Sequence, residues 1–311
     1  MSEQSLADML KNKFWNDLQE IAKSLCQKHS LCYDPNVESH INRWISYVLR
    51  LVEPKERFID FSEGFWERIP KACIPAINLL ADKFEYGENV NPYQSRTIKQ
   101  NNLSEKKGRR TDLLWADWNI HHFHLTTSET LEEDGFYPRS DYLLFAIVRN
   151  DYAYFLDAKL HKKEDCFSDP NFIQQIVKSW PEIAEFNRIE GITPGKELDA
   201  KKIAKYRKMG LNVPVSLNGN VYAMGLGLSS AATPMEDIIF HDILVFEIEN
   251  LAKELVTYCN KKRITINATT FSLIAKKDGL YLACSIDGSY HNIRSHRLEQ
   301  TNRFFNQIWL L

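Results

Sequence analysis

The sequence lacks the signatures of several large enzyme classes. It contains no G-x-x-x-x-G-K-[ST] phosphate-binding loop, no H-E-x-x-H zinc motif and no G-x-S-x-G nucleophile motif. These absences exclude the simple forms of P-loop NTPases, zinc proteases and α/β-hydrolases. No R-x₄₋₆-H pair occurs either, which argues against the helical ribonucleases that use one.

Glycine, proline, paired cysteines and long apolar runs are also scarce. Twelve glycines and eleven prolines in 311 residues are too few for a fibrous repeat or a largely disordered chain. No run of about 18 apolar residues could span a membrane, and the first residues, MSEQSLADML, have no apolar signal-peptide core. None of the six cysteines lies in a C-x-x-C pair. We therefore expect a cytoplasmic protein that does not enter the membrane and keeps its cysteines reduced.

Charge is nearly balanced over the whole chain, with a net charge of −2, but two segments are basic. Lys99–Arg110 carries five cations and one anion, and Lys196–Lys208 carries six cations and two anions. Either segment could be an ordinary solvated surface. Because the two flank a histidine-rich stretch, they favour a substrate that bears phosphate groups.

The apolar pattern changes along the chain. Residues 1–86 repeat apolar side chains at steps of three and four, which predicts a bundle of helices over 6–25, 36–52 and 70–86. Residues 87–110 have the composition of a loop. Strand-like runs follow, with RNDY between two of them as a hairpin turn. The predicted fold class is α+β, with the N-terminal helical bundle followed by an antiparallel sheet packed with helices.

Three consecutive segments follow from this pattern. We predict a helical N-terminal domain over 1–86, an α+β nuclease domain over 87–215, and a C-terminal α+β segment over 216–311 that packs on it. In the third segment, Gly225 and Gly227 interrupt an apolar run, which indicates that the backbone passes close to another part of the fold. A helix of more than twenty residues is expected to begin near Thr233, followed by a hairpin that turns at Asp278 and Gly279.

Histidine is concentrated in one stretch. Three of the nine histidines lie within DLLWADWNIHHFHL, residues 112–125. In a strand, alternate side chains share a face, so His122 and His124 are expected to point one way and His121 and Phe123 the other. His122 and His124 could therefore act together on one substrate.

Three interpretations of the histidines remain open. In the first, they catalyse RNA cleavage as acid and base, because histidine exchanges protons near neutral pH. A cation would then stabilise the phosphorane charge, and the candidates are Arg109, Arg110, Arg139 and Lys159. In the second, His122 and His124 bind a metal ion together with Asp112, Asp117 or His161. In the third, the histidines are hydrogen-bonded members of a polar, aromatic core.

A second group of candidate residues lies on the predicted hairpin. Asp141 is followed sixteen residues later by the D-x-K sequence of Asp157 and Lys159. This spacing resembles the motif of the PD-(D/E)xK nucleases, in which two carboxylates hold Mg²⁺ and the lysine positions the attacking water. The resemblance implies that Asp141 and Asp157 would be metal ligands.

A wider pattern covers roughly residues 90–185. The segments DLLWADWNIHHFHL, RSDYLLFAIV and DAKLH together resemble a group of uncharacterised bacterial proteins associated with toxin and phage-defence loci. The arrangement is similar to that of metal-independent endoribonuclease toxins of the barnase–colicin–interferase type. The resemblance implies functional roles for five positions: His122, His124, Arg139, Asp157 and His161.

Together these patterns predict a nuclease that acts as a toxin or phage-defence effector. The first hypothesis is a metal-independent endoribonuclease that uses His122 and His124 as acid and base, with RNA as its substrate and no cofactor. The second is a Mg²⁺-dependent nuclease of the PD-(D/E)xK type. The third is a non-catalytic module that binds protein or nucleic acid. An antitoxin or other regulatory protein is expected only from the resemblance to toxin loci.

Overall fold

The computed structural model describes residues 2–34, 36, 38–100, 112–162, 166–230, 233–276 and 279–292. The chain forms two compact units, each built from separated parts of the sequence. Unit 1 comprises Met1–Arg50, Lys99–Arg109 and Asp237–Leu311, and unit 2 comprises Leu51–Ile98 and Arg110–Glu236. Helices and strands are mixed in both units, which confirms the predicted α+β class. The units differ from the three consecutive segments predicted at 1–86, 87–215 and 216–311.

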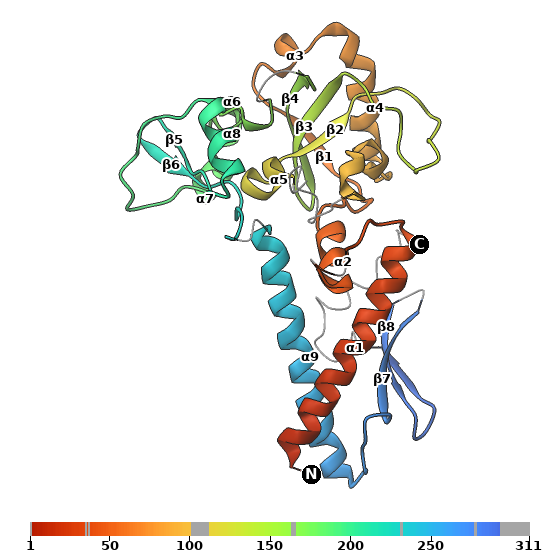
Figure 1. The fold of residues 1–311 in the computed structure, drawn as a ribbon. Helices are drawn as coiled ribbons and strands as arrows, with labels where there is room; N and C mark the ends of the chain where they lie inside the picture. Colours follow the sequence, from red (N-terminus) through yellow and green to blue (C-terminus); the bar gives the residue numbers. More distant parts are fainter. Residues whose placement is uncertain are drawn as a thin grey trace. The chain divides into compact units, whose positions relative to one another are not determined.

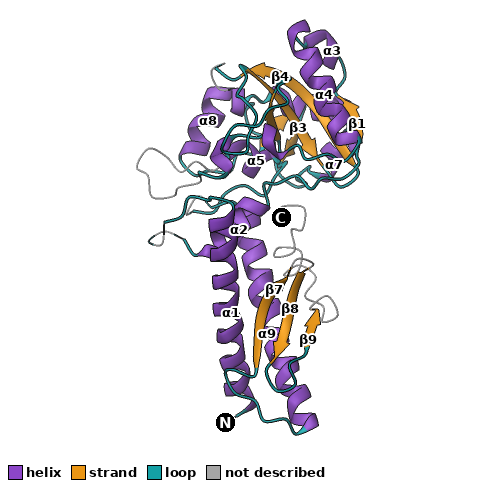
Figure 2. Cartoon of the chain, turned by 90° about the vertical axis from the view of Figure 1, so that its right-hand side faces the viewer, coloured by secondary structure: helices purple, strands orange, loops and turns teal. Residues whose placement is uncertain are grey.

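Unit 1 is built on two long helices and a small sheet (Figures 1 and 2). Its elements are α1 (Glu3–Lys28), α2 (His40–Val48), α9 (Met235–Lys262), β7 (Phe271–Lys276), β8 (Gly279–Cys284) and β9 (Tyr290–Asn292). Helices α1 and α9 run antiparallel, because Lys11 forms a 2.7 Å ion pair with Glu249 while Asn260 donates a hydrogen bond to Glu3. Strands β7, β8 and β9 form an antiparallel sheet in that order.

The apolar stripe predicted over residues 6–25 forms the buried face of helix α1. Its buried side chains include Leu10, Phe14 and Leu18, which repeat at four-residue steps along one face. The hydroxyl of Ser2 accepts a hydrogen bond from the backbone of Ser5 and so caps the first turn. Helix α9 is 28 residues long, which confirms the prediction of a helix of more than twenty residues. The predicted turn residue Asp278 lies outside the described residues.

Unit 2 contains a four-stranded sheet in the order β1–β4–β3–β2 (Figure 1). The strands are β1 (Phe58–Phe61), β2 (His121–His124), β3 (Tyr142–Val148) and β4 (Tyr152–Leu160). β2, β3 and β4 pair antiparallel, and the hairpin predicted at RNDY joins β3 to β4. β1 is a correction to the predicted helical segment 1–86, because it adds a parallel partner to β4.

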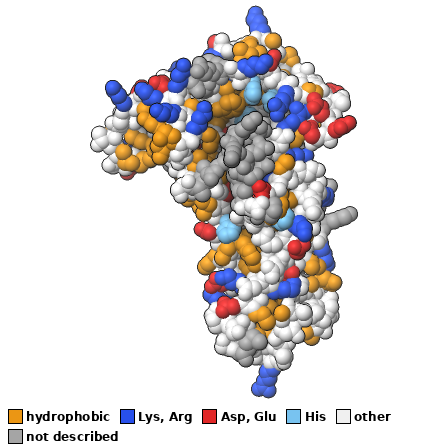
Figure 3. Space-filling view, viewed as in Figure 1, with side chains coloured by type: hydrophobic (Ala, Val, Ile, Leu, Met, Phe, Trp, Pro, Cys, Tyr) orange, Lys and Arg blue, Asp and Glu red, His pale blue; other side chains and the backbone are white. Residues whose placement is uncertain are grey.

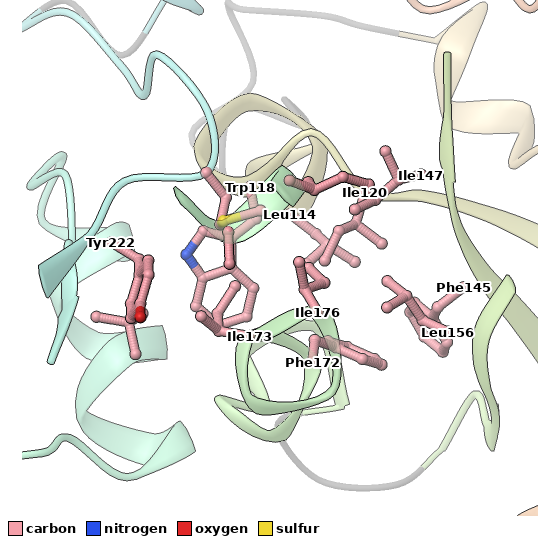
Figure 4. Close-up of a cluster of buried hydrophobic side chains, with 14 of the residues drawn as sticks. Leu114, Trp118, Ile120, Phe145, Ile147, Leu156, Phe172, Ile173, Ile176 and Tyr222 are labelled. Atoms are coloured by element: carbon pink, nitrogen blue, oxygen red, sulfur yellow. The ribbon is translucent and has the colours of Figure 1, made fainter. Parts of the chain in front are cut away.

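A hydrophobic core lies on each face of this sheet. One core includes Phe123, Leu144 and Phe155 and is covered by helices α3 (Phe65–Arg68) and α4 (Ile74–Glu85). The opposite core includes Phe145 and Leu156, and Figure 4 shows their side chains with those of Phe172 and Ile176. That core is covered by α5 (Leu113–Trp118), α6 (Asn171–Ser179), α7 (Pro181–Phe186), α8 (Ala200–Lys208), β5 (Val215–Leu217) and β6 (Asn220–Tyr222). Short 3-10 turns occur at Lys71–Cys73, Asn91–Tyr93, Arg96–Ile98 and Cys166–Ser168.

A β-bulge in β4 changes which side chains reach the second core. Phe145 pairs with Asp157 and Ala146 pairs with Phe155, so Leu156 is the extra residue. Leu156 belongs to the core of Phe145, and Asp157 lies opposite Phe145 in the register. The bulge therefore places Leu156 and Asp157 on the same face, where strict alternation would have separated them.

The glycine pair is explained by close packing. A Cβ atom on Gly225 would lie 2.8 Å from the backbone oxygen of Asp117, too close for any other residue. Gly227 has a φ of +76° and donates a backbone hydrogen bond to Ala116. The expected close approach of the backbone is therefore confirmed, with the end of α5 as its partner.

The predictions about cysteine pairing and membrane spans can be compared with the described residues. All six cysteines are free of disulfides. No helix in the described part of the chain is long and apolar enough to cross a membrane.

Candidate functional site

The histidines of β2 face opposite sides of the sheet as predicted. His122 pairs with Phe145 and His124 with Leu143, and both partners belong to the core under α5 and α6. Phe123 belongs to the other core, on the side of His121. His122 and His124 therefore share one face, because paired residues of neighbouring strands lie on the same side.

A third histidine joins this pair from the end of β4. The ring of His161 lies 5.9 Å from the ring of His124, measured between centroids. The backbone N–H of Ser140 donates to Nδ1 of His124 over 3.4 Å. Arg139 is close enough for its charge to act on both His124 and His161. The fold thus brings together four of the predicted residues: His122, His124, Arg139 and His161.

Burial controls the protonation of two of these histidines. It lowers the pKa of His124 to about 4, and the nearby charge of His122 acts in the same direction. Burial also lowers the pKa of His161, again assisted by His122. Both imidazoles are therefore neutral at pH 7 and can accept a proton. An anion bound between them would favour their charged forms.

His122 is held by a carboxylate and two aromatic rings. Its Nδ1 atom lies 3.2 Å from Oδ2 of Asp112, with both side chains nine-tenths buried. Oδ1 of Asp112 accepts a hydrogen bond from the backbone of Trp115 and so caps α5. The ring of Phe167 meets the His122 ring edge-on at 5.1 Å, and Phe145 lies 6.4 Å away.

The second candidate group lies on the same face, two strands away from β2. The Nζ atom of Lys159 is 2.5 Å from Asp169 and 3.5 Å from Asp157. It also stands 4.1 Å from the centre of the Phe172 ring. The ammonium group of Lys159 therefore occupies the space between two carboxylates, where a cation would otherwise bind.

Asp141 is not part of the group around Lys159. In the β3–β4 register Asp141 lies opposite His161, whose backbone N–H donates to the Asp141 carbonyl over 2.7 Å. The residue opposite Asp157 is Phe145. Four strand residues, or about 13 Å, separate the positions of His161 and Asp157. This register separates the two carboxylates that the magnesium hypothesis requires to share one ion.

Metal binding by other residues finds little support in the described parts of the chain. No group of three or more His, Cys, Asp or Glu side chains there is arranged to hold a metal ion. Asp117, one of the candidate ligands, instead accepts a 2.7 Å hydrogen bond from Nε of Arg207. That ion pair is buried, with Arg207 stacked 4.0 Å from the centre of the Trp118 ring.

Several residues at the site were not predicted in their present roles. Asp169, Phe167 and Arg207 come from later segments and reach the site through tertiary packing. The hairpin turn at 149–151 would place position 160 opposite Asp141, far from Asp157, and the bulge at Leu156 shifts that partner to 161. Arg109 and Arg110, predicted as possible phosphate-binding cations, lie outside the described residues.

Comparison with known proteins adds no assignment, since no family model, curated protein or solved structure matches the chain.

Proposed function

We propose that this protein is a metal-independent endoribonuclease whose active site is the cluster of His122, His124 and His161. The observation that supports it best is the convergence of three imidazoles from β2 and β4 on one side of the sheet, with Arg139 in electrostatic reach. Paired imidazoles can accept one proton and donate another without a metal ion.

The proposed reaction requires the ribose 2′-hydroxyl. One histidine accepts the hydroxyl proton while the 2′-oxygen forms a bond to the adjacent phosphorus. The bond from phosphorus to the 5′-oxygen breaks, and a second, protonated histidine gives its proton to that oxygen. The products are a 2′,3′-cyclic phosphate and a free 5′-hydroxyl, so atoms and charge balance without a co-reactant.

Arg139 is the better of the two cations for the phosphorane. Its side chain is exposed and its charge acts on both His124 and His161. Lys159, in contrast, is buried and already paired with Asp157 and Asp169. We assign Arg139 to stabilisation of the developing charge and Lys159 to support of the sheet face on which His124 lies.

A basic surface in unit 2 suits an RNA strand. Helix α8 exposes four lysines, Lys201, Lys202, Lys205 and Lys208. Figure 3 shows Lys and Arg side chains beside exposed hydrophobic ones over the part of unit 2 where Figure 1 places α8. Such surfaces bind the phosphate backbone with little dependence on base sequence. A role as a toxin or phage-defence effector, restrained by an antitoxin, follows from the sequence resemblance.

The decisive experiment is cleavage of end-labelled RNA and of the matching DNA by the purified protein, in EDTA and in Mg²⁺ or Mn²⁺. The proposal predicts cleavage of RNA in EDTA, no cleavage of DNA, and products that end in a cyclic phosphate. RNA with a 2′-O-methyl group at every position is the matched control and should remain intact.

Two other outcomes would reject the proposal. Cleavage that requires the metal and is abolished by Asp157→Asn, while His124→Asn retains it, would support the magnesium-dependent hypothesis. RNA binding without cleavage under every condition, even in the presence of cell extract, would support the non-catalytic binding module.

A further inference from the structure

The two histidines on the proposed catalytic face of β2 have different partners at the same ring atom. At His122 the Nδ1 atom lies 3.2 Å from the Asp112 carboxylate, which can only accept a hydrogen bond when it is ionised. At His124 the Nδ1 atom faces the backbone N–H of Ser140, which can only donate. In a neutral imidazole one nitrogen donates and the other accepts, so these partners select opposite tautomers.

The surroundings of His122 hold its ring in this arrangement. Phe167 and Phe145 contact the ring from two elements, the 3-10 turn at 166–168 and β3. The Nδ1 atom is buried and forms no hydrogen bond within the described part of the chain, so the Asp112 carboxylate acts on it electrostatically over 3.2 Å. Asp112 is in turn fixed by its hydrogen bond from the Trp115 backbone.

The charged groups around this pair are few among the described residues. Arg207 lies within electrostatic reach of Asp112. His124 and His161 lie within electrostatic reach of His122, and Arg139 within reach of both. The Asp112 carboxylate lies 3.2 Å from Nδ1 of His122.

We infer that Asp112 is a positioning residue that fixes the tautomer of His122 and so presents His122 as the general base, and that His124 is held in the opposite tautomer. With its proton on Nδ1, on the side of the Asp112 carboxylate, His122 presents an unprotonated Nε2. With Nδ1 accepting from Ser140, neutral His124 presents Nε2–H. The role of His122 as base rests on the proposed function, but the tautomers themselves do not.

The first test is NMR of the full-length protein labelled with ¹⁵N at histidine, at pH 7.5. The two-bond couplings between ring nitrogens and carbon-bound protons distinguish the tautomers directly. The expected result is Nδ1–H for His122 and Nε2–H for His124. If both rings show the same tautomer, the inference is overturned, whether or not the protein cleaves RNA.

The second test is Asp112→Asn, which keeps a good helix cap and removes the charge. Asp199→Asn is the matched control, because Asp199 caps α8 in the same way through the backbone of Lys202. We expect Asp112→Asn to populate the Nε2–H form of His122 and to lower kcat about 10²-fold with little change in KM.

The pH profile separates positioning from a loss of fold. Without the Asp112 charge the acid limb of the kcat profile should move, whereas a loss of fold would lower kcat equally at every pH. Asp199→Asn should change neither the limb nor the tautomers. An Asp112→Asn protein with unaltered His122 couplings and an unaltered acid limb would overturn the inference. Absence of RNA cleavage by the wild-type protein would instead reject the proposed function.

Discussion

Each unit contains one histidine whose pKa is lowered to about 4 by burial, but the two histidines have different neighbours. In unit 1, His29 lies 5.4 Å from the Trp44 ring and 5.7 Å from the Tyr47 ring. In unit 2, His124 lies beside His161, within electrostatic reach of His122 and Arg139. The same lowering of the pKa thus accompanies packing against aromatic rings in unit 1 and a cluster of titratable side chains in unit 2. The shift alone does not locate a functional site; the arrangement of neighbouring groups does.

The largest expected difference between the two histidines is in RNA cleavage. His124→Asn and His161→Asn remove a proton donor or acceptor while keeping a polar side chain, and each should lower kcat by about 10³-fold. His29→Asn should leave kcat within about twofold, because His29 lies in unit 1 and outside the cluster. Initial rates of cleavage of labelled RNA in EDTA give kcat for each of the three variants. A loss of activity in folded His29→Asn equal to that in His124→Asn would contradict the comparison.

In acid, by contrast, both histidines should behave alike. A histidine with a pKa of about 4 in the folded protein and about 6.5 in the unfolded chain is neutral in both states above pH 7, so it contributes no pH dependence there. As the pH falls below 6.5 the unfolded chain binds the proton first, and stability is lost until the folded protein is also protonated near pH 4.

For buried His124 this loss amounts to about 2 kcal/mol between pH 7.5 and pH 5. Urea unfolding at the two pH values should therefore show a smaller pH dependence in His124→Asn than in the wild-type protein. His29→Asn should reduce the dependence in the same direction and by a similar amount, because burial lowers the pKa of His29 to about 4 as well. A pH dependence unchanged in both variants would mean that burial lowers the pKa of neither histidine in the folded protein.

The same contrast shows what the sequence could and could not predict. Local patterns sufficed for the α1 stripe and for the shared face of His122 and His124, because both depend only on the period of a helix or strand. They did not suffice for β1, a strand of four residues whose partner β4 lies about ninety residues further along the chain. Nor did they suffice for the interleaved units, since α1 packs with α9 across more than two hundred residues of sequence.

The candidate site shows the same limit at the level of single residues. The bulge at Leu156 turns Asp157 and Lys159 toward the face of the Phe145 core, but β4 is an almost continuous apolar run in which no pattern marks an extra residue. Asp112 was predicted only as a possible metal ligand, and its ion pair with His122 depends on how α5 turns into β2. Asn119 makes that turn with a positive φ of 54°, a conformation that asparagine tolerates better than most residues.

The smallest expected effect concerns the basic surface of α8, and it tests whether unit 2 alone binds RNA. Lys205→Glu combined with Lys208→Glu should weaken binding of uncleavable 2′-O-methyl RNA about tenfold at low salt. The slope of log K against log salt should also fall by about 1.4, because two phosphate contacts are lost on a single strand. The matched variant in unit 1 is Lys23→Glu with Lys28→Glu on α1. It reverses two charges on a helix that carries no proposed site, so neither the affinity nor the slope should change. Equal losses in both variants would mean that the protein attracts RNA through its overall charge, and that the lysines of α8 do not form a binding surface of their own.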